Sequence, residues 1–231
     1  MDLSGYDFLD FGASTGESMQ FAQKRLTGHR GVGIDIDPYK VQKARANGCE
    51  CLIGDITNID APAQAVRFVV MSHVLEHLPN EQTLAKAIAE AARVARDFLF
   101  VRGPNFDDDI YLKEHGLKWY WSDWTGHPFH LTTAILRRHL DALHLNDRHL
   151  IHFSGARNAR DPALHPLNSP KDQHQYIEGV HPPKPHKILD RLVFREFACF
   201  VRLRPFPEWT QTVHAILREL LSYESATFDC Y

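Results

Sequence analysis

The sequence has no apolar run approaching the length of a membrane span, and its first residues hold no basic stretch followed by an apolar one. These absences predict a chain without a membrane partner or a leader peptide. A formal net charge of -3 provides no excess of basic residues to attract a nucleic-acid backbone, so we expect no nucleic-acid partner. The four cysteines lack the spacing of zinc or redox sites, which predicts reduced, buried thiols in a cytoplasmic protein.

Short apolar segments alternate with helical patterns through the first half of the chain. Because the segments are apolar on both faces, they predict parallel strands covered by helices on both sides. One helix has explicit boundary signals, with Asp37 as N-cap, Pro38 in the first turn and Gly48 past the end. The predicted strands are 6–12, 31–36, 50–55, 68–73 and 97–103. Further helices are predicted from two apolar faces, Met19, Ala22 and Leu26, and Leu84, Ile88, Ala91 and Ala95. This βαβαβ order predicts a doubly wound α/β sheet.

The second half contains two long segments with weak helical or strand patterns, residues 104–130 and 156–187. Loops of such length are uncommon unless they are functional or disordered. The other predicted elements are an amphipathic helix that begins at Thr132 or Thr133 and continues through Ile135, Leu136, Leu140 and Leu143, strands at 149–154 and 195–204, and a final helix with Val213, Ile216, Leu217, Leu220 and Leu221 on its apolar face. We interpret the chain as one domain, residues 1–231, with insertions at about 104–130 and 156–187.

The turn after the first strand, "LDFGASTG", has only part of a dinucleotide-binding pattern. Such a pattern would have glycine at 12, 14 and 17, whereas this chain has Gly12, Ser14, Gly16 and Glu17. The missing glycines disfavour an NAD-dependent Rossmann enzyme, and we keep that enzyme only as a remote alternative.

Three carboxylates, Asp10, Asp35 and Asp55, stand at the ends of the first three predicted strands, where an open α/β sheet has its binding crevice. Three acids would bind a pyrophosphate poorly, because a pyrophosphate needs bare backbone N–H groups. They would favour a cationic ligand that is rich in hydrogen-bond donors. Asp35 could accept from two ribose hydroxyls, Asp55 from an adenine amine, and Asp10 could help to hold an ammonium group. S-adenosyl-L-methionine (SAM) has all three features and no phosphate.

The segments "LDFGASTG", "GIDIDP", "GDIT" and "VVMSHVLEHL", taken in order, resemble the class I SAM-dependent methyltransferases. The resemblance is greatest to the small-molecule group of the ubiquinone-biosynthesis type (methyltransferase type 11/23-like), over residues 6–105 and more faintly over 127–145. It implies a Rossmann-like, mostly parallel seven-stranded sheet with an antiparallel strand near the C-terminus. It also implies SAM as cofactor and S-adenosyl-L-homocysteine (SAH) as product. The cofactor-binding residues that it implies are Asp10, Gly12, Ala13, Ser14, Gly16, Asp35, Ile36, Asp55, Ile56, Ser72 and His73.

The chain also departs from that family. Ser14 replaces the usual middle glycine, which we expect to be tolerated if its φ stays negative. Arg67 stands where the family usually has an acid. The sequence begins five residues before the first predicted strand, without the helices that normally cover the cofactor. We therefore expect 104–130, 156–187, or a partner subunit or second copy of the chain to cover the site, unless it stays open.

Several candidates also have a structural explanation. Asp55 could cap the turn in "DITN". The acidic run 107–109 could be a solvated loop or a magnesium site for a catechol-like substrate. The aromatic cluster of Trp119, Tyr120, Trp121 and Trp124 could form a substrate wall or anchor a loop. The loop histidines lack a cysteine partner or helical i, i+4 spacing, so we expect no metal site; they are His127, His130, His165, His174, His181 and His186.

Methyl transfer to a hydroxyl or an amine requires an aligned nucleophile and benefits from a base of near-neutral pKa. We expect His130 to be that base and His73 to position the acceptor, both as neutral imidazoles, with His127 as a third candidate. The predicted function is methyl transfer to a small-molecule acceptor at a hydroxyl, carboxyl or amine. The main alternative is a SAM-binding protein without catalysis, acting in regulation or dependent on a partner.

Overall fold

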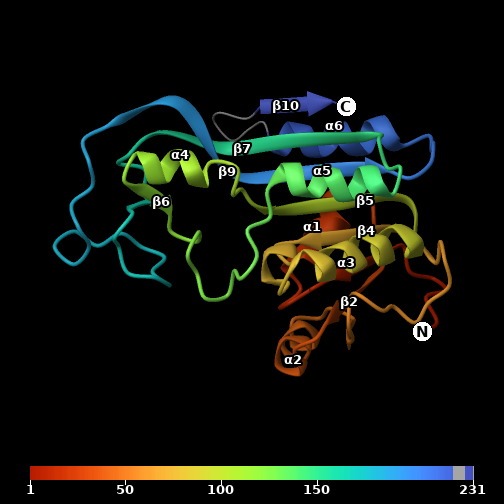
Figure 1. Cartoon of the computed structure of the whole chain (residues 1–231). Helices are drawn as coiled ribbons and strands as arrows, with labels where there is room; N and C mark the ends of the chain where they lie inside the picture. Colours follow the sequence, from red (N-terminus) through yellow and green to blue (C-terminus); the bar gives the residue numbers. More distant parts are fainter. Residues whose placement is uncertain (221–226, 231) are drawn as a thin grey trace.

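The computed structural model of the chain describes residues 1–220 and 227–230. Its main element is an eight-stranded sheet in the order β10-β7-β9-β5-β4-β1-β2-β3, and a separate small sheet pairs β6 with β8 (Figure 1). Strands β1 to β5 pair in parallel, whereas β9 runs antiparallel to both β5 and β7. The mostly parallel, doubly wound sheet with an antiparallel strand near the C-terminus is confirmed, and β10 adds an eighth strand to the seven that we predicted.

All the predicted strands are present, with bounds that differ by a few residues. The strands are β1 (Phe8–Phe11), β2 (Gly31–Asp35), β3 (Cys51–Ile53), β4 (Val66–Ser72), β5 (Ala95–Pro104), β6 (Leu117–Trp119), β7 (Arg148–Asn158), β8 (Leu164–Pro166), β9 (Ile188–Arg202) and β10 (Thr227–Cys230). The helices are α1 (Glu17–Arg25), α2 (Pro38–Ala46), the 3-10 helix η1 (Leu75–His77), α3 (Glu81–Val94), α4 (Asp109–Glu114), α5 (Thr133–Ala142) and α6 (Trp209–Leu220). None of the helices in the described ranges is long and apolar enough to cross a membrane.

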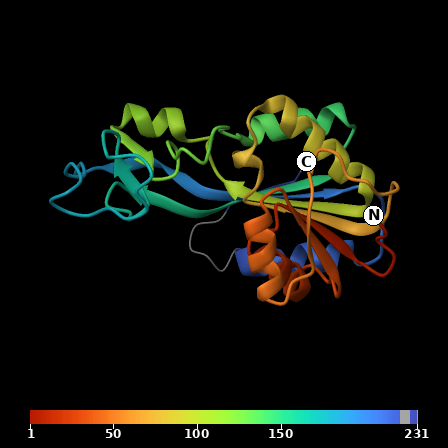
Figure 2. The ribbon, with the colours of Figure 1, turned by 90° about the horizontal axis from the view of Figure 1, so that it is seen from below.

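Helices cover both faces of the main sheet (Figure 2). Helices α3 and α5 bury Leu84 and Leu136 in the core on one face. Helices α1, α2 and α6 pack on the other face, where Met19 contributes to a second core. Cys51 and Cys199 are buried free thiols in these cores, as predicted, whereas the free Cys49 is only half-buried. Since both faces are covered, the apolar character of the parallel strands on both sides is explained.

The predicted helix starts are confirmed by their capping bonds. The side chain of Asp37 accepts a hydrogen bond from Tyr39 N at 2.8 Å, and that of Thr132 accepts one from Ile135 N at 3.2 Å. Helix α3 ends at Val94, so the prediction that Ala95 lies on its face is wrong, and Ala95 instead begins β5. Leu143 caps the end of α5 and is 38% exposed, outside the apolar face. Leu221 of the predicted final helix lies outside the described residues.

The two segments predicted as insertions fold together. Helix α4, strands β6 and β8 and the outer ends of β7 and β9 form a unit that we call the lobe, which extends from one end of the main sheet (Figure 2). Its core includes Leu112, Trp119, Leu164 and Val193, drawn from all these elements. Neither segment could bury this apolar surface alone, because each supplies only one side of the core. Their joint folding explains why the sequence of each segment, considered alone, resembles that of a loop.

Candidate active site

The turn between β1 and α1 follows a left-handed backbone path. Gly12, Ser14 and Gly16 have φ of 71°, 47° and 94°. A Cβ atom on Gly12 would lie 2.3 Å from Val74 Cγ2, so only glycine fits there. The expectation that Ser14 keeps a negative φ is wrong. A serine in this region costs roughly 1–2 kcal/mol, and a hydrogen bond from its N–H to Asp35 offsets that cost.

Asp35 connects this turn to the start of α2. Its Oδ2 accepts from Ser14 N and its Oδ1 accepts from Asp37 N, each at 2.9 Å. The residue is only 6% exposed, yet it lines a cavity at the carboxyl ends of β1, β2 and β4. Because a carboxylate oxygen has two lone pairs, both oxygens remain able to accept a further bond from a ligand hydroxyl.

We call this hollow the strand-end cavity; its volume is about 440 Å³. Its lining residues are Gly12, Ser14, Asp35, Ile36, Lys40, Gly54, Asp55, Ile56, Thr57, His73, Val74, His77, Leu78, Pro79 and Thr83. Ile36 is apolar but 74% exposed, which leaves an uncovered apolar surface beside the Asp35 carboxylate. An apolar surface beside a paired acceptor matches a nucleoside, which presents a flat ring and two neighbouring hydroxyls.

Asp55 stands on the far rim of the strand-end cavity. Its Oδ1 accepts from both the N–H and the hydroxyl of Thr57, each at 2.8 Å. The turn-capping explanation is therefore confirmed. It is compatible with ligand binding, because these bonds engage Oδ1 and the residue is exposed to the cavity.

Four predicted cofactor residues are not among the lining residues of the strand-end cavity: Asp10, Ala13, Gly16 and Ser72. Asp10 is fully buried under the turn, where Oδ2 accepts from Ser18 Oγ at 2.5 Å. Its Oδ1 has no hydrogen-bond partner among the described residues. Burial raises the pKa of this carboxyl to about 7. Sequence reasoning missed several lining residues. Those that follow β4 could have been found by the strand-end rule. The missed residues are Lys40, Gly54, Thr57, Val74, His77, Leu78, Pro79 and Thr83.

A second hollow of about 330 Å³, which we call the aromatic cavity, adjoins the first. Its lining residues are His73, Glu76, His77, Pro104, Tyr120, Trp121, Trp124, His127, Ala163, Arg195 and Glu196. Three members of the predicted aromatic cluster thus form walls, while Trp119 is fully buried and stacks on Trp121 with ring centroids 5.0 Å apart. The anchoring explanation is confirmed for Trp119, and the substrate-wall explanation stays a prediction for the three residues that line the cavity. His73 and His77 line both cavities.

His73 lies at this junction between two carboxylates. Its Nε2 is 3.2 Å from Glu196 Oε2, and its Nδ1 is 3.6 Å from Glu76 Oε1. Burial alone would lower the pKa of His73, but the hydrogen bonds to Glu196 and Glu76 outweigh it and raise the pKa to about 9. The expectation of a neutral His73 at pH 7 is therefore wrong, because a sequence does not show that β9 brings Glu196 to the ring. The raised pKa favours the protonated ring of His73 at pH 7, in which both nitrogens are donors.

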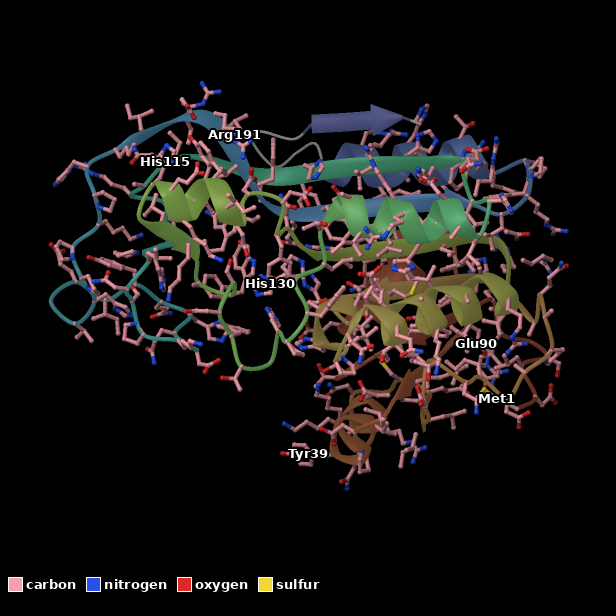
Figure 3. The ribbon with its side chains drawn as sticks, viewed as in Figure 1. Met1, Tyr39, Glu90, His115, His130 and Arg191 are labelled. Carbon is pink, nitrogen blue, oxygen red and sulfur yellow. The ribbon has the colours of Figure 1, made fainter. Side chains whose placement is uncertain are left out.

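The two other histidine candidates differ in position. His127 is buried in the aromatic cavity, and its Nδ1 lies 3.1 Å from the carbonyl oxygen of Trp121. Burial lowers its pKa, so the ring is neutral at pH 7. His130 lies on the segment between the lobe and α5 (Figure 3), outside the lining of both cavities among the described residues. Its Nδ1 is 3.0 Å from Asp109 Oδ2, and its ring stacks on Phe106.

The acidic run 107–109 is exposed only at Asp107, and it forms no group of potential metal ligands among the described residues. Asp107 accepts from Thr133, Asp108 accepts from Arg191, and Asp109 accepts from Ser122. Because the three carboxylates diverge to different elements, they do not converge on one ion. The magnesium explanation is therefore wrong, and the solvated-loop explanation holds only for Asp107, which also connects the run to α5.

A different group of potential metal ligands does converge. One ligand atom each from Glu76, His77 and His127 lies within 4.8 Å of the other two. The sequence spacing that led us to expect no metal site did not show this proximity, because the fold brings 127 to 76–77 across about fifty residues.

Comparison with known proteins agrees with this geometry. Residues 8–97 match a family described as "Methyltransferase domain". No curated protein matches the sequence significantly. Among solved structures, a SAM-dependent methyltransferase from Archaeoglobus fulgidus has a TM-score of 0.60 at 16% identity, over 87% of this chain and 88% of that one.

Two further structures are similar in fold. Magnesium protoporphyrin IX methyltransferase from Synechocystis PCC 6803, with bound SAH, has a TM-score of 0.50 at 17% identity, over 87% of this chain and 75% of that one. The complex between the Haloferax volcanii Trm112 methyltransferase activator and a putative methyltransferase gives 0.56 at 14% identity, over 88% of this chain and 84% of that one.

The doubly wound sheet and the cavity at its strand ends agree with the class I methyltransferase fold. Residues 8–97 match a methyltransferase domain, and the chain shares the fold of SAM-dependent methyltransferases, whose cofactor is SAM. The residues present fit this cofactor, because Asp35 and Ile36 offer the paired acceptor and the apolar surface that its nucleoside requires. The NAD-dependent alternative is set aside.

Proposed function

We propose that the enzyme transfers the SAM methyl group to a small-molecule acceptor bound in the aromatic cavity, at a hydroxyl, a carboxyl or an amine. The observation that carries this proposal is the junction of the two cavities at His73 and His77. Methyl transfer requires the nucleophile to approach the methyl carbon in line with the carbon–sulfur bond. An acceptor in the aromatic cavity would have its reacting atom at this junction.

The strand-end cavity would hold SAM, whose sulfonium supplies an already activated methyl group. Asp35 would accept bonds from the ribose hydroxyls, Ile36 and Ile56 would contact the adenine ring, and Asp55 would accept from its amine. We assign an indirect role to the predicted residues that do not line the cavity. Asp10, for example, would support the turn from below through Ser18.

The size of the aromatic cavity supports a small acceptor, since about 330 Å³ is within the range of small-molecule sites. A third, open groove of about 930 Å³ continues from it and shares Tyr120 and Arg195. Arg160 and Lys184 also line this groove. These cationic side chains would favour an acceptor with an anionic tail that reaches out of the aromatic cavity.

We assign activation of the acceptor to groups that line the aromatic cavity, in place of His130. Glu76, His77 and His127 all line it and lie close together. The charged ring of His73 would donate a hydrogen bond and position the acceptor, while its charge disfavours the role of base.

The covering of the strand-end cavity remains part of the proposal. The lining of this cavity, as described, includes no residue of 104–130 or 156–187. Ile36 and Tyr39 near its rim are 74% and 61% exposed. We propose two alternatives for this cavity. Either it stays open to solvent, or a partner subunit, including a second copy of the chain, covers it and completes the site.

The experiment is a transfer assay with methyl-labelled SAM and a panel of small hydroxyl, carboxyl and amine acceptors. We expect turnover of at least one panel member, and Trp124→Ala should raise its KM at least tenfold while SAH affinity is unchanged. Tyr39→Ala removes an exposed aromatic residue outside both cavities and is the matched control. Methylation of nucleic acid or protein alone, or SAH binding without any transfer, would overturn the proposal.

A further inference from the structure

The cluster of Glu76, His77 and His127 combines two short segments at the edge of the aromatic cavity. Glu76 and His77 belong to η1, directly after β4, while His127 belongs to the loop that precedes α5. The two imidazole rings meet edge to face, with centroids 4.9 Å apart. All three side chains line the aromatic cavity, and His77 also lines the strand-end cavity.

The tautomers of both histidines are fixed by backbone carbonyls. His77 Nδ1 lies 2.6 Å from Gly126 O, and His127 Nδ1 lies 3.1 Å from Trp121 O. A carbonyl oxygen only accepts hydrogen bonds, so each Nδ1 must carry the proton. In the neutral form of each ring, Nε2 then presents a lone pair. Metal-binding histidines have this arrangement, in which a carbonyl or carboxylate orients the ring through the nitrogen that does not bind the metal.

Glu76 adds a buried carboxylate to the two imidazoles. The residue is 2% exposed, and its Oε1 lies 3.6 Å from His73 Nδ1. A buried carboxylate is costly unless it is paired or coordinates a cation. A metal ion beside the two imidazoles would give this carboxylate a second positive partner in addition to His73.

We propose that Glu76, His77 and His127 bind a divalent transition-metal ion of the Zn²⁺ class. Two histidines and one glutamate, with a fourth position left open, are the ligand set of catalytic rather than structural zinc sites. Tetrahedral bonds of about 2.0–2.2 Å place ligand atoms about 3.4 Å apart, so a set within 4.8 Å needs to contract by roughly 1 Å. His77 is exposed, so its ring has room to turn.

The catalytic role of this metal site rests on the proposed function. The open position faces the cavity in which we place the acceptor. An acceptor hydroxyl bound there would lose its proton to water more readily, because the ion stabilises the oxyanion. The oxygen electron pair would then form the new bond to the methyl carbon. The carbon–sulfur bond would break with its electron pair left on sulfur, which gives SAH.

The test is a titration of the chelator-treated full-length protein with Co²⁺, followed by visible absorption, and with Zn²⁺, followed by calorimetry. We expect one tight equivalent of metal, with the intense visible bands of tetrahedral Co²⁺. His77→Ala and Glu76→Gln should each weaken binding at least 30-fold. His77 is exposed and Glu76→Gln preserves side-chain shape, so urea denaturation should show that both variants are folded. His29→Ala, which removes an exposed histidine remote from the cluster in sequence, should bind metal as the unaltered protein does.

The outcomes separate this inference from the proposed function. Absence of a tight equivalent, or unchanged binding in folded His77→Ala and Glu76→Gln, would overturn the metal site and leave methyl transfer standing. If metal binds as expected but chelator-treated enzyme methylates its acceptor at full rate, the catalytic role is overturned. If no acceptor is methylated, the Co²⁺ titration still decides whether the site exists.

Discussion

Replacement of Asp35 by alanine is the most direct test of the cofactor site, because one carboxylate serves both the ligand and the fold. As bound, the ribose would donate two hydrogen bonds to a charged acceptor. The loss of such charge-assisted bonds should weaken SAH binding by roughly 1.5–3 kcal/mol, or about 10- to 150-fold.

The same substitution should also destabilise the protein. Ser14 N and Asp37 N both donate to the Asp35 carboxylate at 2.9 Å, and alanine leaves both donors without this acceptor. We expect the free energy of unfolding to fall by about 2–4 kcal/mol.

Asp37→Ala is the matched control, because it removes a neighbouring carboxylate that caps α2 and does not line the strand-end cavity. It should cost about 1 kcal/mol of stability and leave SAH affinity within about twofold. Calorimetric titration with SAH and urea denaturation of both variants measure the two quantities. Unchanged SAH affinity in a folded Asp35→Ala protein, or an equal loss in Asp37→Ala, would refute our assignment of Asp35.

Three further predictions concern proton binding, the base and the groove. The pKa of Asp10 is raised to about 7 in the folded protein, so the folded state keeps a proton that the unfolded state releases near pH 4. Between pH 5 and 8 the wild type should therefore lose about 2–3 kcal/mol of its free energy of unfolding relative to Asp10→Asn. Urea denaturation measures this difference, and a difference independent of pH would contradict the prediction. His127→Ala should lower kcat at least 10²-fold and His130→Ala less than tenfold, in assays with an identified acceptor; the reverse order would restore His130 as the base. Lys184→Ala should raise the KM of an anionic acceptor about five- to twentyfold at low salt and leave SAH affinity unchanged, whereas an equal effect on a neutral acceptor would exclude an electrostatic role.

The parallel half of the fold was predictable because its signals are local. The strand-end aspartates, the Asp37–Pro38 helix start and the apolar runs each depend on neighbouring residues, and each was found. The lobe was not predictable in the same way. Its core joins Leu112 to Leu164, so neither segment shows its partner in its own pattern. Segments that fold only against each other look like loops when they are considered one at a time.

The charge states of the site residues could not be predicted from the sequence either. An imidazole beside a sulfonium site was reasonably expected to be neutral, but Glu196 arrives from β9, more than one hundred residues later, and accepts from His73. His130 was expected among aromatic rings, yet Asp109 faces it. Both errors have one cause: burial can be inferred from a sequence, whereas the partner of a buried polar group depends on tertiary pairing.

The lining of the strand-end cavity includes two strained backbone positions. Ser14 and His73 both have positive φ, 47° and 52°, although neither is glycine. Each is held by carboxylates, Ser14 N by Asp35 and the ring of His73 by Glu76 and Glu196. Such conformations persist only where surrounding contacts over-determine them, and they gather at functional sites. Here the contacts that hold the strain are the same carboxylates to which we assign ribose and metal binding. A ligand at Asp35 or Glu76 therefore meets a backbone that already has the geometry needed to bind it. His73 lines both cavities and so connects their positions.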